Sequence, residues 1–307
     1  MITIFSTPKP FRGHIKVIQR NAIMSWSLLH PEVEIILFGD EEGAADVCAE
    51  FGVRHEPVVS RNSSGLPYLN HIFDTVQNIA RHAVVCYANC DIVLMSDFCA
   101  ALSRTRLKHP RFLMVGQRWE VPITEPYNFS GPAWPVTLRK FVSERGRLAG
   151  PFGIDYFAFP RGLYRDMPPL LVGRASWDHW MLWKAKNLGA AVVDATSVVM
   201  AIHQIHDYSH HPQGLRGTLE GAEAIENRRL AGGRWHLCTL LEATHRLTPE
   251  GESRNWGHSL SLARRYVWRP IWFRFLDASR PLRQRLGLRQ GALEAFLHRV
   301  RGSVGIQ

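Results

Sequence analysis

The sequence predicts an α/β fold, in which a mostly parallel central sheet is flanked by helices on both faces. Short apolar runs alternate with segments of helical periodicity between residues 2 and 202. Strands and helices that alternate in this way form parallel sheets covered by helices. The composition, with 46% hydrophobic and 21% charged residues, is that of a globular chain and excludes a disordered one.

The alternation is clearest in the first hundred residues. Ile18, Ala22 and Trp26 share one face of the first predicted helix, and Pro31 stops it. We expect strands at residues 2–6, 33–38, 53–58, 82–87 and 92–94, and helices at residues 15–29, 44–51 and 69–80.

The pattern is less regular after residue 110. Residues 118–134 are rich in Pro, Trp and polar side chains, which predicts a loop. Apolar runs and one helical segment return further along the chain. We expect strands at residues 112–117, 153–160, 191–194 and 198–202, and a helix at residues 176–189.

Polar side chains follow several of the predicted strands at the point where each strand ends. Thr7, Asp40 and Asp91 are the clearest examples. In parallel sheets ligands bind at the carboxyl ends of the strands, where the loops gather. The sequence therefore predicts a binding site at this edge of the sheet.

The basic charge of the chain is concentrated near its C-terminus. The net charge is +10, and residues 253–307 contain 11 Arg, no Lys and two acidic residues, Asp277 and Glu294. This segment thus carries +9, while the rest of the chain has 26 basic and 25 acidic side chains. We predict one main domain at residues 1–252 and a basic helical appendage at residues 253–307.

Aromatic residues and arginines are interleaved in this appendage. Trp268, Trp272 and Leu276 recur every four residues, and two prolines divide the segment into short helices. Such helices bind anionic membrane surfaces, but a helical cap packed on the main domain has the same pattern. No nucleic-acid partner is expected, because no RNA- or DNA-binding motif is present.

Cysteine usage and the N-terminal residues predict a cytoplasmic protein. The five cysteines form no Cys-x-x-Cys pair, so neither a disulfide framework nor a cysteine zinc site is expected. The chain begins with an apolar strand pattern that no basic segment precedes, which is unlike a signal peptide. If the appendage binds membranes, we expect a peripheral association with the inner membrane face.

Two segments contain carboxylates in settings that suit catalysis. Asn89 and Asp91 follow an apolar strand, where a carboxylate can hold Mg²⁺ or Mn²⁺ against a diphosphate, although such turns also occur without a metal. Asp178 opens a helix between Trp177 and Trp180, an apolar wall that can stack on a sugar and raise the pKa of a carboxyl group. The same carboxylate could instead stabilise the helix dipole.

Histidines form the densest group of potential metal ligands. His203, His206, His210 and His211 lie within nine residues of one another, directly after a predicted strand. A zinc hydrolase would use such a group, but no His-Glu-x-x-His signature is present. At least one of these histidines is expected to have a functional role.

Four segments, taken in order, resemble the motifs of GT-A fold glycosyltransferases. Residues 87–94 (Tyr-Ala-Asn-Cys-Asp-Ile-Val-Leu) are similar to their metal-binding Asp-x-Asp element, with Asn89 in place of the first Asp. Residues 153–161 resemble the strand after that element, and residues 176–189 their catalytic acid and helix. His203 stands where many of them have a late metal-binding histidine. A group of bacterial and plant nucleotide-diphospho-sugar transferases shares the runs Asp155-Tyr156-Phe157 and His203-Gln204-x-His206-Asp207-Tyr208.

The resemblance implies a Rossmann-like sheet of the GT-A type and an enzyme that moves a sugar from a nucleotide-diphosphate sugar to an acceptor hydroxyl. The acceptor would be a glycan or a lipid-linked molecule. It also implies a nucleotide-binding half at about residues 1–117 and an acceptor-binding, catalytic half at about residues 118–252. The implied roles are Asp91, His203 and His206 as ligands of Mn²⁺ or Mg²⁺, Phe5, Ser6, Thr7, Asp40, Asn89 and Asp91 around the nucleotide, Asp155 and Trp177 at the substrates, and Asp178 as the general base.

Two departures from the family pattern affect these expectations. Asn89 removes one carboxylate and lowers the expected metal affinity, and Trp177 stands where an acid would pair with Asp178. A single base predicts inversion at the anomeric centre. Two other functions remain open: a metal-dependent phosphohydrolase that uses residues 203–211, and a non-catalytic adaptor that binds anionic partners through residues 253–307.

Overall fold

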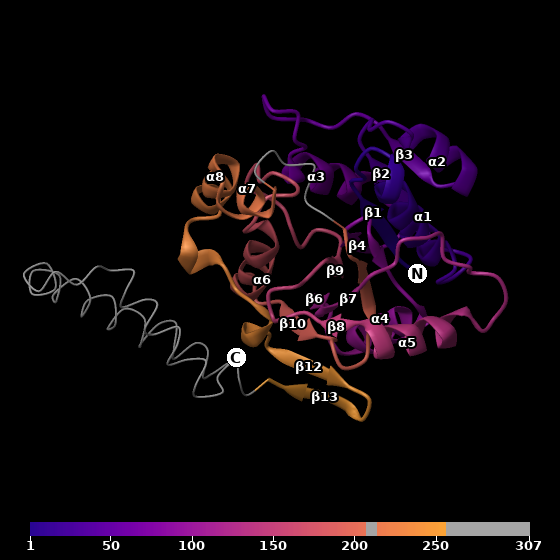
Figure 1. Cartoon of the computed structure of the whole chain (residues 1–307). Helices are drawn as coiled ribbons and strands as arrows, with labels where there is room; N and C mark the ends of the chain where they lie inside the picture. Colours follow the sequence, from indigo (N-terminus) through magenta and orange to yellow (C-terminus); the bar gives the residue numbers. More distant parts are fainter. Residues whose placement is uncertain (207–213, 256–307) are drawn as a thin grey trace, which may run out of the picture. The chain divides into compact units, whose positions relative to one another are not determined.

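A nine-stranded sheet forms the centre of the computed structural model, which describes residues 1–206 and 214–255 (Figure 1). Its strands lie in the order β13-β12-β10-β6-β9-β4-β1-β2-β3. Neighbours are parallel except where β9 or β13 is involved, so the predicted mostly parallel sheet is confirmed. The strands are β1 (Thr3–Ser6), β2 (Glu34–Phe38), β3 (Arg54–Glu56), β4 (Val84–Ala88), β6 (Phe112–Val115), β9 (Tyr156–Pro160), β10 (Ala191–Asp194), β12 (His245–Thr248) and β13 (Gly251–Arg254).

A smaller sheet contains four strands in the order β5-β11-β7-β8. These are β5 (Ile92–Val93), β11 (Ala201–Gln204), β7 (Arg118–Val121) and β8 (Arg147–Leu148). The loop expected at residues 118–134 is therefore wrong at its beginning. Residues 118–121 become a strand because they pair with β11, more than 80 residues away in the chain, and no local pattern signals that pairing.

Helices cover both faces of the large sheet, as predicted. Residues 44–51 form a helix with the expected bounds, and the other predicted helices differ by at most two residues at either end. The helix over residues 96–108 is not among the predicted helices; only Phe98, Ala101, Leu102 and Thr105 of its 13 residues are buried, which gives it a weak apolar pattern. The helices are α1 (Gly13–Ser27), α2 (Ala44–Phe51), α3 (Leu69–Ile79), α4 (Ser96–Lys108), α5 (Trp134–Arg145), α6 (Trp177–Asn187), α7 (Gly214–Glu220) and α8 (Ala222–Leu230), with short 3-10 turns at Arg234–His236 and Leu240–Glu242.

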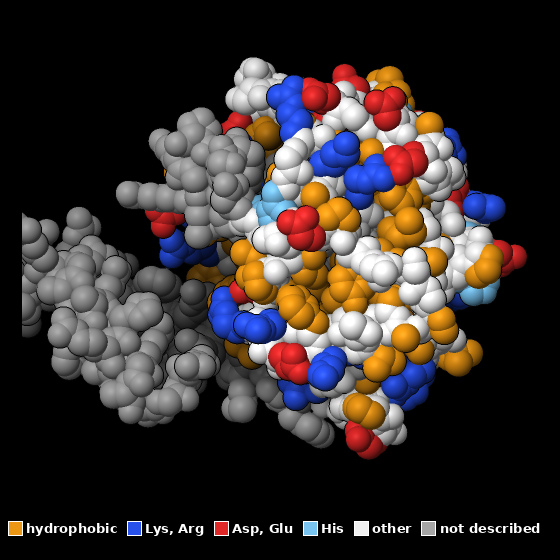
Figure 2. All heavy atoms as spheres, turned by 45° about the vertical axis from the view of Figure 1, so that its right-hand side comes forward, with side chains coloured by type: hydrophobic (Ala, Val, Ile, Leu, Met, Phe, Trp, Pro, Cys, Tyr) orange, Lys and Arg blue, Asp and Glu red, His pale blue; other side chains and the backbone are white. Residues whose placement is uncertain are grey.

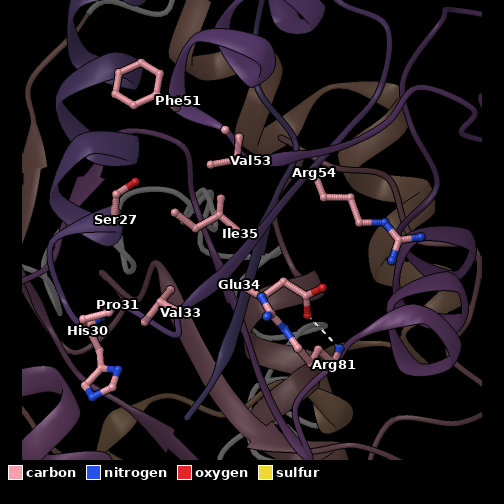
Figure 3. Close-up of a pocket in the computed structure, with 11 residues that line it drawn as sticks. Ser27, His30, Pro31, Val33, Glu34, Ile35, Phe51, Val53, Arg54 and Arg81 are labelled. Atoms are coloured by element: carbon pink, nitrogen blue, oxygen red, sulfur yellow. Dashed lines mark hydrogen bonds between the residues drawn. The ribbon is translucent and has the colours of Figure 1, made fainter.

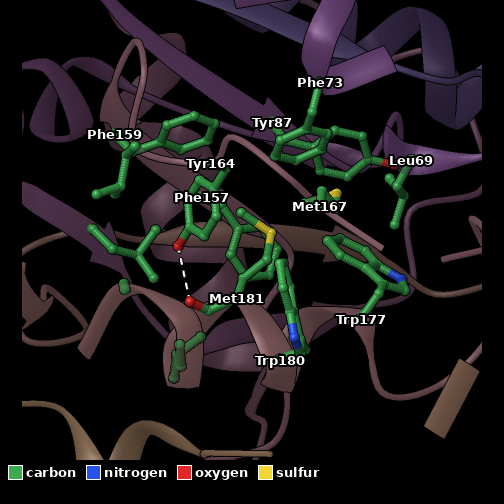
Figure 4. Packing of buried hydrophobic residues seen from close by; sticks show 14 of the residues in the cluster. Leu69, Phe73, Tyr87, Phe157, Phe159, Tyr164, Met167, Trp177, Trp180 and Met181 are labelled. Carbon is green, nitrogen blue, oxygen red and sulfur yellow. Dashed lines mark hydrogen bonds between the residues drawn. The ribbon is translucent and has the colours of Figure 1, made fainter. Parts of the chain in front are cut away.

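The central strands are buried on both faces, which explains their continuous apolar sequences. In β1, Phe5 points into one core cluster, and Ile4 points into the other. The first cluster packs under α3 and α6, and Figure 4 shows part of it, including Phe73, whose ring contacts those of Tyr87 and Phe159. The second packs under α1, α2 and α4. Within the central strands, polar side chains are thus confined to the strand ends.

The surface of the described part carries both signs of charge. On the face in Figure 2, basic and acidic side chains are interspersed with apolar ones. This agrees with the near balance of charges outside residues 253–307. The last described residue is Asn255, just after β13; residues 256–307, with the interleaved Arg and Trp, lie outside the described residues. The appendage and the boundary at residue 252 stay predictions.

We predict that Phe73→Ala lowers the free energy of unfolding by about 3–5 kcal/mol, because the variant leaves a cavity in an aromatic cluster. The Phe73 ring is fully buried and lies 5.1 Å from the ring of Phe5 and 5.7 Å from that of Phe159. Urea unfolding measures the change. The control Phe152→Ala, at a ring that is 63% exposed, should change stability by less than about 0.5 kcal/mol. Similar losses in the two variants would contradict this description of the core.

Candidate active site

Two cavities lie at opposite ends of the strands. One, of about 310 Å³, lies at the amino ends of β2 and β3 (Figure 3). The carboxylate in it, Glu34, is already engaged, since its Oε2 accepts hydrogen bonds from the Thr3 hydroxyl and from the Arg81 backbone N–H, at 2.6 and 2.7 Å. The other, of about 400 Å³, lies at the carboxyl ends of β1 and β4, where the sequence predicts a site. Asp91 and Asp178 both line this second cavity, which we call the active-site pocket.

Asp91, His203 and His206 form a compact group in the active-site pocket. Oδ2 of Asp91 lies 3.1 Å from Nε2 of His206 and 3.7 Å from Nε2 of His203. One ligand atom from each residue lies within 4.8 Å of the others, so a single metal ion could contact all three. The structure thus brings together the three residues that the family resemblance implies as metal ligands. His210 and His211 lie outside the described residues.

Strand pairing explains why residues over 100 positions apart meet here. β5 starts directly after Asp91 and pairs antiparallel with β11, in a register that sets His203 opposite Ile92. Gln204, which is fully buried, follows His203 and donates from Nε2 to the carbonyl oxygens of Asp91 and Ile18, at 3.0 and 2.7 Å. These bonds fix the Asp91 turn against β11 and α1.

The electrostatics of the group suit a cation. Burial would raise the pKa of Asp91, but the charge of His203 and the hydrogen bond from His206 outweigh burial and hold this pKa well below its usual range. Burial lowers the pKa of His203 in spite of the attraction of Asp91, which favours the neutral imidazole that a metal ligand requires. Oδ1 of Asp91 and Nδ1 of His203 are buried without hydrogen-bond partners. A carboxylate oxygen without a partner and neighbouring imidazoles are a donor set that fits a divalent cation.

Asn89, Asp155 and Arg118 form a second polar group beside the first. The Asn89 amide donates to Oδ1 of Asp155 at 2.7 Å, and Nη1 of Arg118 donates to Oδ2 of the same carboxylate at 2.6 Å. Burial would lower the pKa of Arg118, but Asp155 raises it above its ordinary value. Because β9 runs antiparallel to β4, Asp155 at its start lies at the same sheet edge as Asn89. The amide nitrogen of Asn89 is thus directed to Asp155, and Asp155 bridges two neighbours in the pocket wall.

Asp178 lies in the first turn of α6, and its carboxylate has few partners. Oδ1 is buried with no hydrogen-bond partner, and Oδ2 lies 3.6 Å from Nε2 of His179, beyond hydrogen-bond distance. The preceding Ser176 has a φ of 93°, a conformation that is strained for a side chain other than Gly. Such strain is common where a fold directs a functional side chain into a cavity.

The two tryptophans beside Asp178 differ in position. Trp177 lines the active-site pocket, with its ring centre 5.2 Å from that of Tyr87, and is 6% exposed. Trp180 packs in the core cluster under α6, as Figure 4 shows. The wall expected from two tryptophans therefore has Trp177 alone at the pocket, and its contact with a substrate stays a prediction.

Only some of the predicted nucleotide-binding residues line the active-site pocket. Thr7 lines the active-site pocket, whereas Phe5 is fully buried in the core and the Ser6 hydroxyl donates to the carbonyl of Ala88 at 2.6 Å. Asp40 is exposed, is not among the residues that line the pocket, and pairs with Arg61 at 2.8 Å. The roles of Phe5, Ser6 and Asp40 at the nucleotide stay predictions. Because the side chains of Phe5 and Ser6 are already engaged, these two residues would contact the nucleotide through their backbone atoms.

Sequence reasoning missed several charged residues of the pocket. Glu41 and Arg61 lie in it and pair at 2.9 Å, and Arg174 lies in it while pairing with Glu223 of α8 at 2.7 Å. No local motif marks these residues, since each reaches the pocket from a separate loop. Glu41 could have been found from its position directly after Asp40 at the end of β2.

The described part of the chain contains no helix long and apolar enough to cross a bilayer. This finding covers residues 1–206 and 214–255 and does not test the predicted location of the protein or the predicted binding of residues 253–307 to an anionic surface.

Comparisons with known proteins find similar solved structures, while no family model and no curated protein matches the sequence. S. aureus TarS is 9% identical, with a TM-score of 0.43 over 66% of this chain and 36% of that chain. The mannosyltransferase PcManGT from Pyrobaculum calidifontis, in complex with GDP-Man and Mn²⁺, is 14% identical, with a TM-score of 0.40 over 67% of this chain and 57% of that chain. M. tuberculosis glucosyl-3-phosphoglycerate synthase is 14% identical, with a TM-score of 0.45 over 76% of this chain and 81% of that chain.

The chain spans 36% of the length of TarS and 57% of that of the mannosyltransferase. Other structures contain TarS 1-349 with UDP-GlcNAc and the synthase with Mg²⁺ and UDP. With identities of 9–14% and TM-scores below 0.5, the chemistry of the pocket follows from its own residues.

We predict that Gln204→Leu weakens metal binding as well as the fold. The variant removes the two side-chain hydrogen bonds that hold the carbonyl oxygens of Asp91 and Ile18, each of which contributes about 0.5–1.5 kcal/mol. Isothermal titration with MnCl₂ and urea unfolding measure the two effects. Gln77→Leu is the matched control, because Gln77 also donates to two carbonyl oxygens, those of Phe73 and Tyr164, away from the pocket. Equal Mn²⁺ affinity in the two variants would contradict the positioning role of Gln204.

Proposed function

We propose that the chain is a glycosyltransferase that moves a sugar from a nucleotide-diphosphate sugar to an acceptor hydroxyl. One observation carries this proposal: the Asp91, His203 and His206 group and Asp178 line the same pocket at the carboxyl ends of the strands. A cation site and a separate carboxylate are the two elements that transfer from a diphosphate leaving group requires. The similar structures, which include a mannosyltransferase bound to GDP-Man and Mn²⁺, support the same class of donor.

Basic side chains in the pocket suit a diphosphate. Lys9 lies near enough to lower the pKa of Asp91, and its backbone is held by Gln19, which exchanges hydrogen bonds of 2.6 and 2.8 Å with it. Arg61 and Arg174 enter from two other loops. A divalent cation held by Asp91, His203 and His206 would add positive charge against the departing diphosphate.

In the chemical step Asp178 acts as the general base. The acceptor oxygen forms a bond to the anomeric carbon as the bond from that carbon to the diphosphate oxygen breaks, and the nucleoside diphosphate leaves with the electron pair. Asp178 accepts the proton of the acceptor hydroxyl on Oδ1, the carboxylate oxygen that has no hydrogen-bond partner. A single displacement of this kind inverts the anomeric configuration.

We expect Asp178→Asn to lower the transfer rate about 10²–10⁴-fold with donor affinity unchanged, because the amide cannot accept the proton. A panel of UDP- and GDP-sugars with saccharide and lipid-linked acceptors provides the assay, and NMR of the product should show inversion. Asp46→Asn is the matched control: Asp46 also lies in the first turn of a helix, but away from the pocket. Near-normal transfer by Asp178→Asn, or retention of configuration, would overturn the assigned base. Release of a sugar phosphate and a nucleoside monophosphate without any transfer would favour the phosphohydrolase.

We further expect Mn²⁺ to support donor binding better than Mg²⁺. Two imidazoles beside one carboxylate form a set richer in nitrogen than Mg²⁺ usually takes. In thermal unfolding with UDP or GDP, Mn²⁺ should raise Tm more than Mg²⁺; a ligand at a hundredfold excess over Kd contributes about 2.7 kcal/mol. Asp91→Asn should abolish the Mn²⁺-dependent part of the shift. An equal response to the two ions, or a full response of Asp91→Asn, would contradict the assigned ligands.

A further inference from the structure

A second group of potential metal ligands lies outside the active-site pocket. His109 follows the last residue of α4, His245 starts β12 and Glu252 lies on β13. One ligand atom from each lies within 4.8 Å of the others. None of the three residues lines either of the two cavities described above. The His109–Glu252 contact of 2.9 Å joins the end of α4 to the hairpin β12–β13, which forms one edge of the large sheet.

Glu252 is a buried carboxylate, and one of its two oxygens has no hydrogen-bond partner. Its side chain is only 6% exposed, and its Oε1 lies 2.9 Å from Nε2 of His109. The other oxygen, Oε2, is buried with no hydrogen-bond partner. A buried carboxylate oxygen without a partner is costly, and a cation between Glu252 and the two imidazoles would remove that cost.

The hydrogen bonds of Thr244 fix the tautomer and the ring orientation of His245, as an outer partner does for a metal-bound histidine. The Thr244 hydroxyl accepts from the Val192 backbone N–H at 2.9 Å and donates to the Val192 carbonyl oxygen at 3.1 Å. Its single proton is therefore used, so at 2.9 Å it accepts the N–H of Nδ1 of His245. In this tautomer Nδ1 carries the proton, and the lone pair of Nε2 is available to a metal ion. In metal-bound histidines the nitrogen that does not bind the metal typically donates to such an outer partner.

The rings and the surroundings fit a single ion of moderate affinity. The ring centres of His109 and His245 lie 4.7 Å apart with an interplanar angle of 51°, so the rings are tilted rather than stacked. Arg254 and Lys108 act on His245 electrostatically and oppose a cation, while Glu252 supplies the negative charge. Two imidazoles and one carboxylate are a common donor set for Zn²⁺.

We propose that His109, His245 and Glu252 bind one Zn²⁺ ion, with water as the fourth ligand, which fastens the β12–β13 hairpin to the end of α4. Such an ion would strengthen the attachment of the hairpin, because β12 pairs with β10 at only two positions, Val193 with His245 and Asp194 with Arg246. Another contact, from Arg104 of α4 to the carbonyl oxygen of Thr248, ties the far end of the hairpin to the same helix.

The test uses the full-length protein freed of metal with a chelator and titrated with ZnCl₂ against a chromogenic chelator. Because the Asp91 group can also hold Zn²⁺, the titration is repeated on a variant with His203→Ala and His206→Ala. We expect this variant to retain one equivalent of Zn²⁺ and to lose it when Glu252→Gln or His245→Ala is added. If the double variant does not fold, the wild-type protein should fall from two equivalents to one with Glu252→Gln alone.

Two further readouts separate the zinc site from a purely structural cluster. Co²⁺ at the site should give the visible absorption of a tetrahedral complex, and Zn²⁺ should raise Tm; Glu252→Gln should remove both responses. Glu250→Gln is the matched control, since Glu250 lies exposed in the turn of the same hairpin and should change neither response. If Glu252→Gln and His245→Ala leave the stoichiometry, the cobalt spectrum and the Tm response unchanged, the proposal is overturned.

Discussion

The burial of the central sheet on both faces is the constraint on which the rest of the structure depends. Strands such as β4 and β6 have side chains in both core clusters, so nearly every position along them is apolar. Polar groups can then gather only where strands end, and parallel neighbours end at the same edge. The active-site pocket is the consequence: Thr7, Asn89 and Asp91 reach it from two adjacent parallel strands. The antiparallel β9 adds Asp155 at its start.

The balance of charges in the pocket depends on long-range pairing. Asp91 stays ionised in a buried position because His203 on β11 and His206 just after β11 lie beside it. The strand β11 is held there by β5 and by the side chain of Gln204. A substitution that loosened this pairing would leave a buried carboxylate without compensating groups, a state that costs far more than the loss of one hydrogen bond. Stability and metal binding are therefore coupled at this position.

Periodicity predicted most of the large sheet and its helices, because those elements depend on their own apolar patterns. It failed at β7, which is a strand through its pairing with β11, and at the β12–β13 hairpin, whose sequence alternates weakly. For the site, the resemblance singled out Asp91, His203 and His206, which the structure brings together. Arg118 and Arg174 could not be found in this way, since Arg118 starts the unpredicted strand β7 and Arg174 lies in a loop, and their partners Asp155 and Glu223 are far along the chain.

The two proposed sites have one feature in common, which is a buried carboxylate oxygen without a hydrogen-bond partner. Among the described residues, four carboxylate oxygens are buried without a hydrogen-bond partner, and they belong to Glu41, Asp91, Asp178 and Glu252. Three of these residues line the active-site pocket, and the fourth lies in the His109 and His245 group. A fold tolerates few such atoms, because each loses its hydration without replacement. At a binding site the ligand supplies the missing partner. The unfavourable free energy of an unpartnered buried carboxylate oxygen therefore indicates both the active-site pocket and the hairpin site, although the two share no residue.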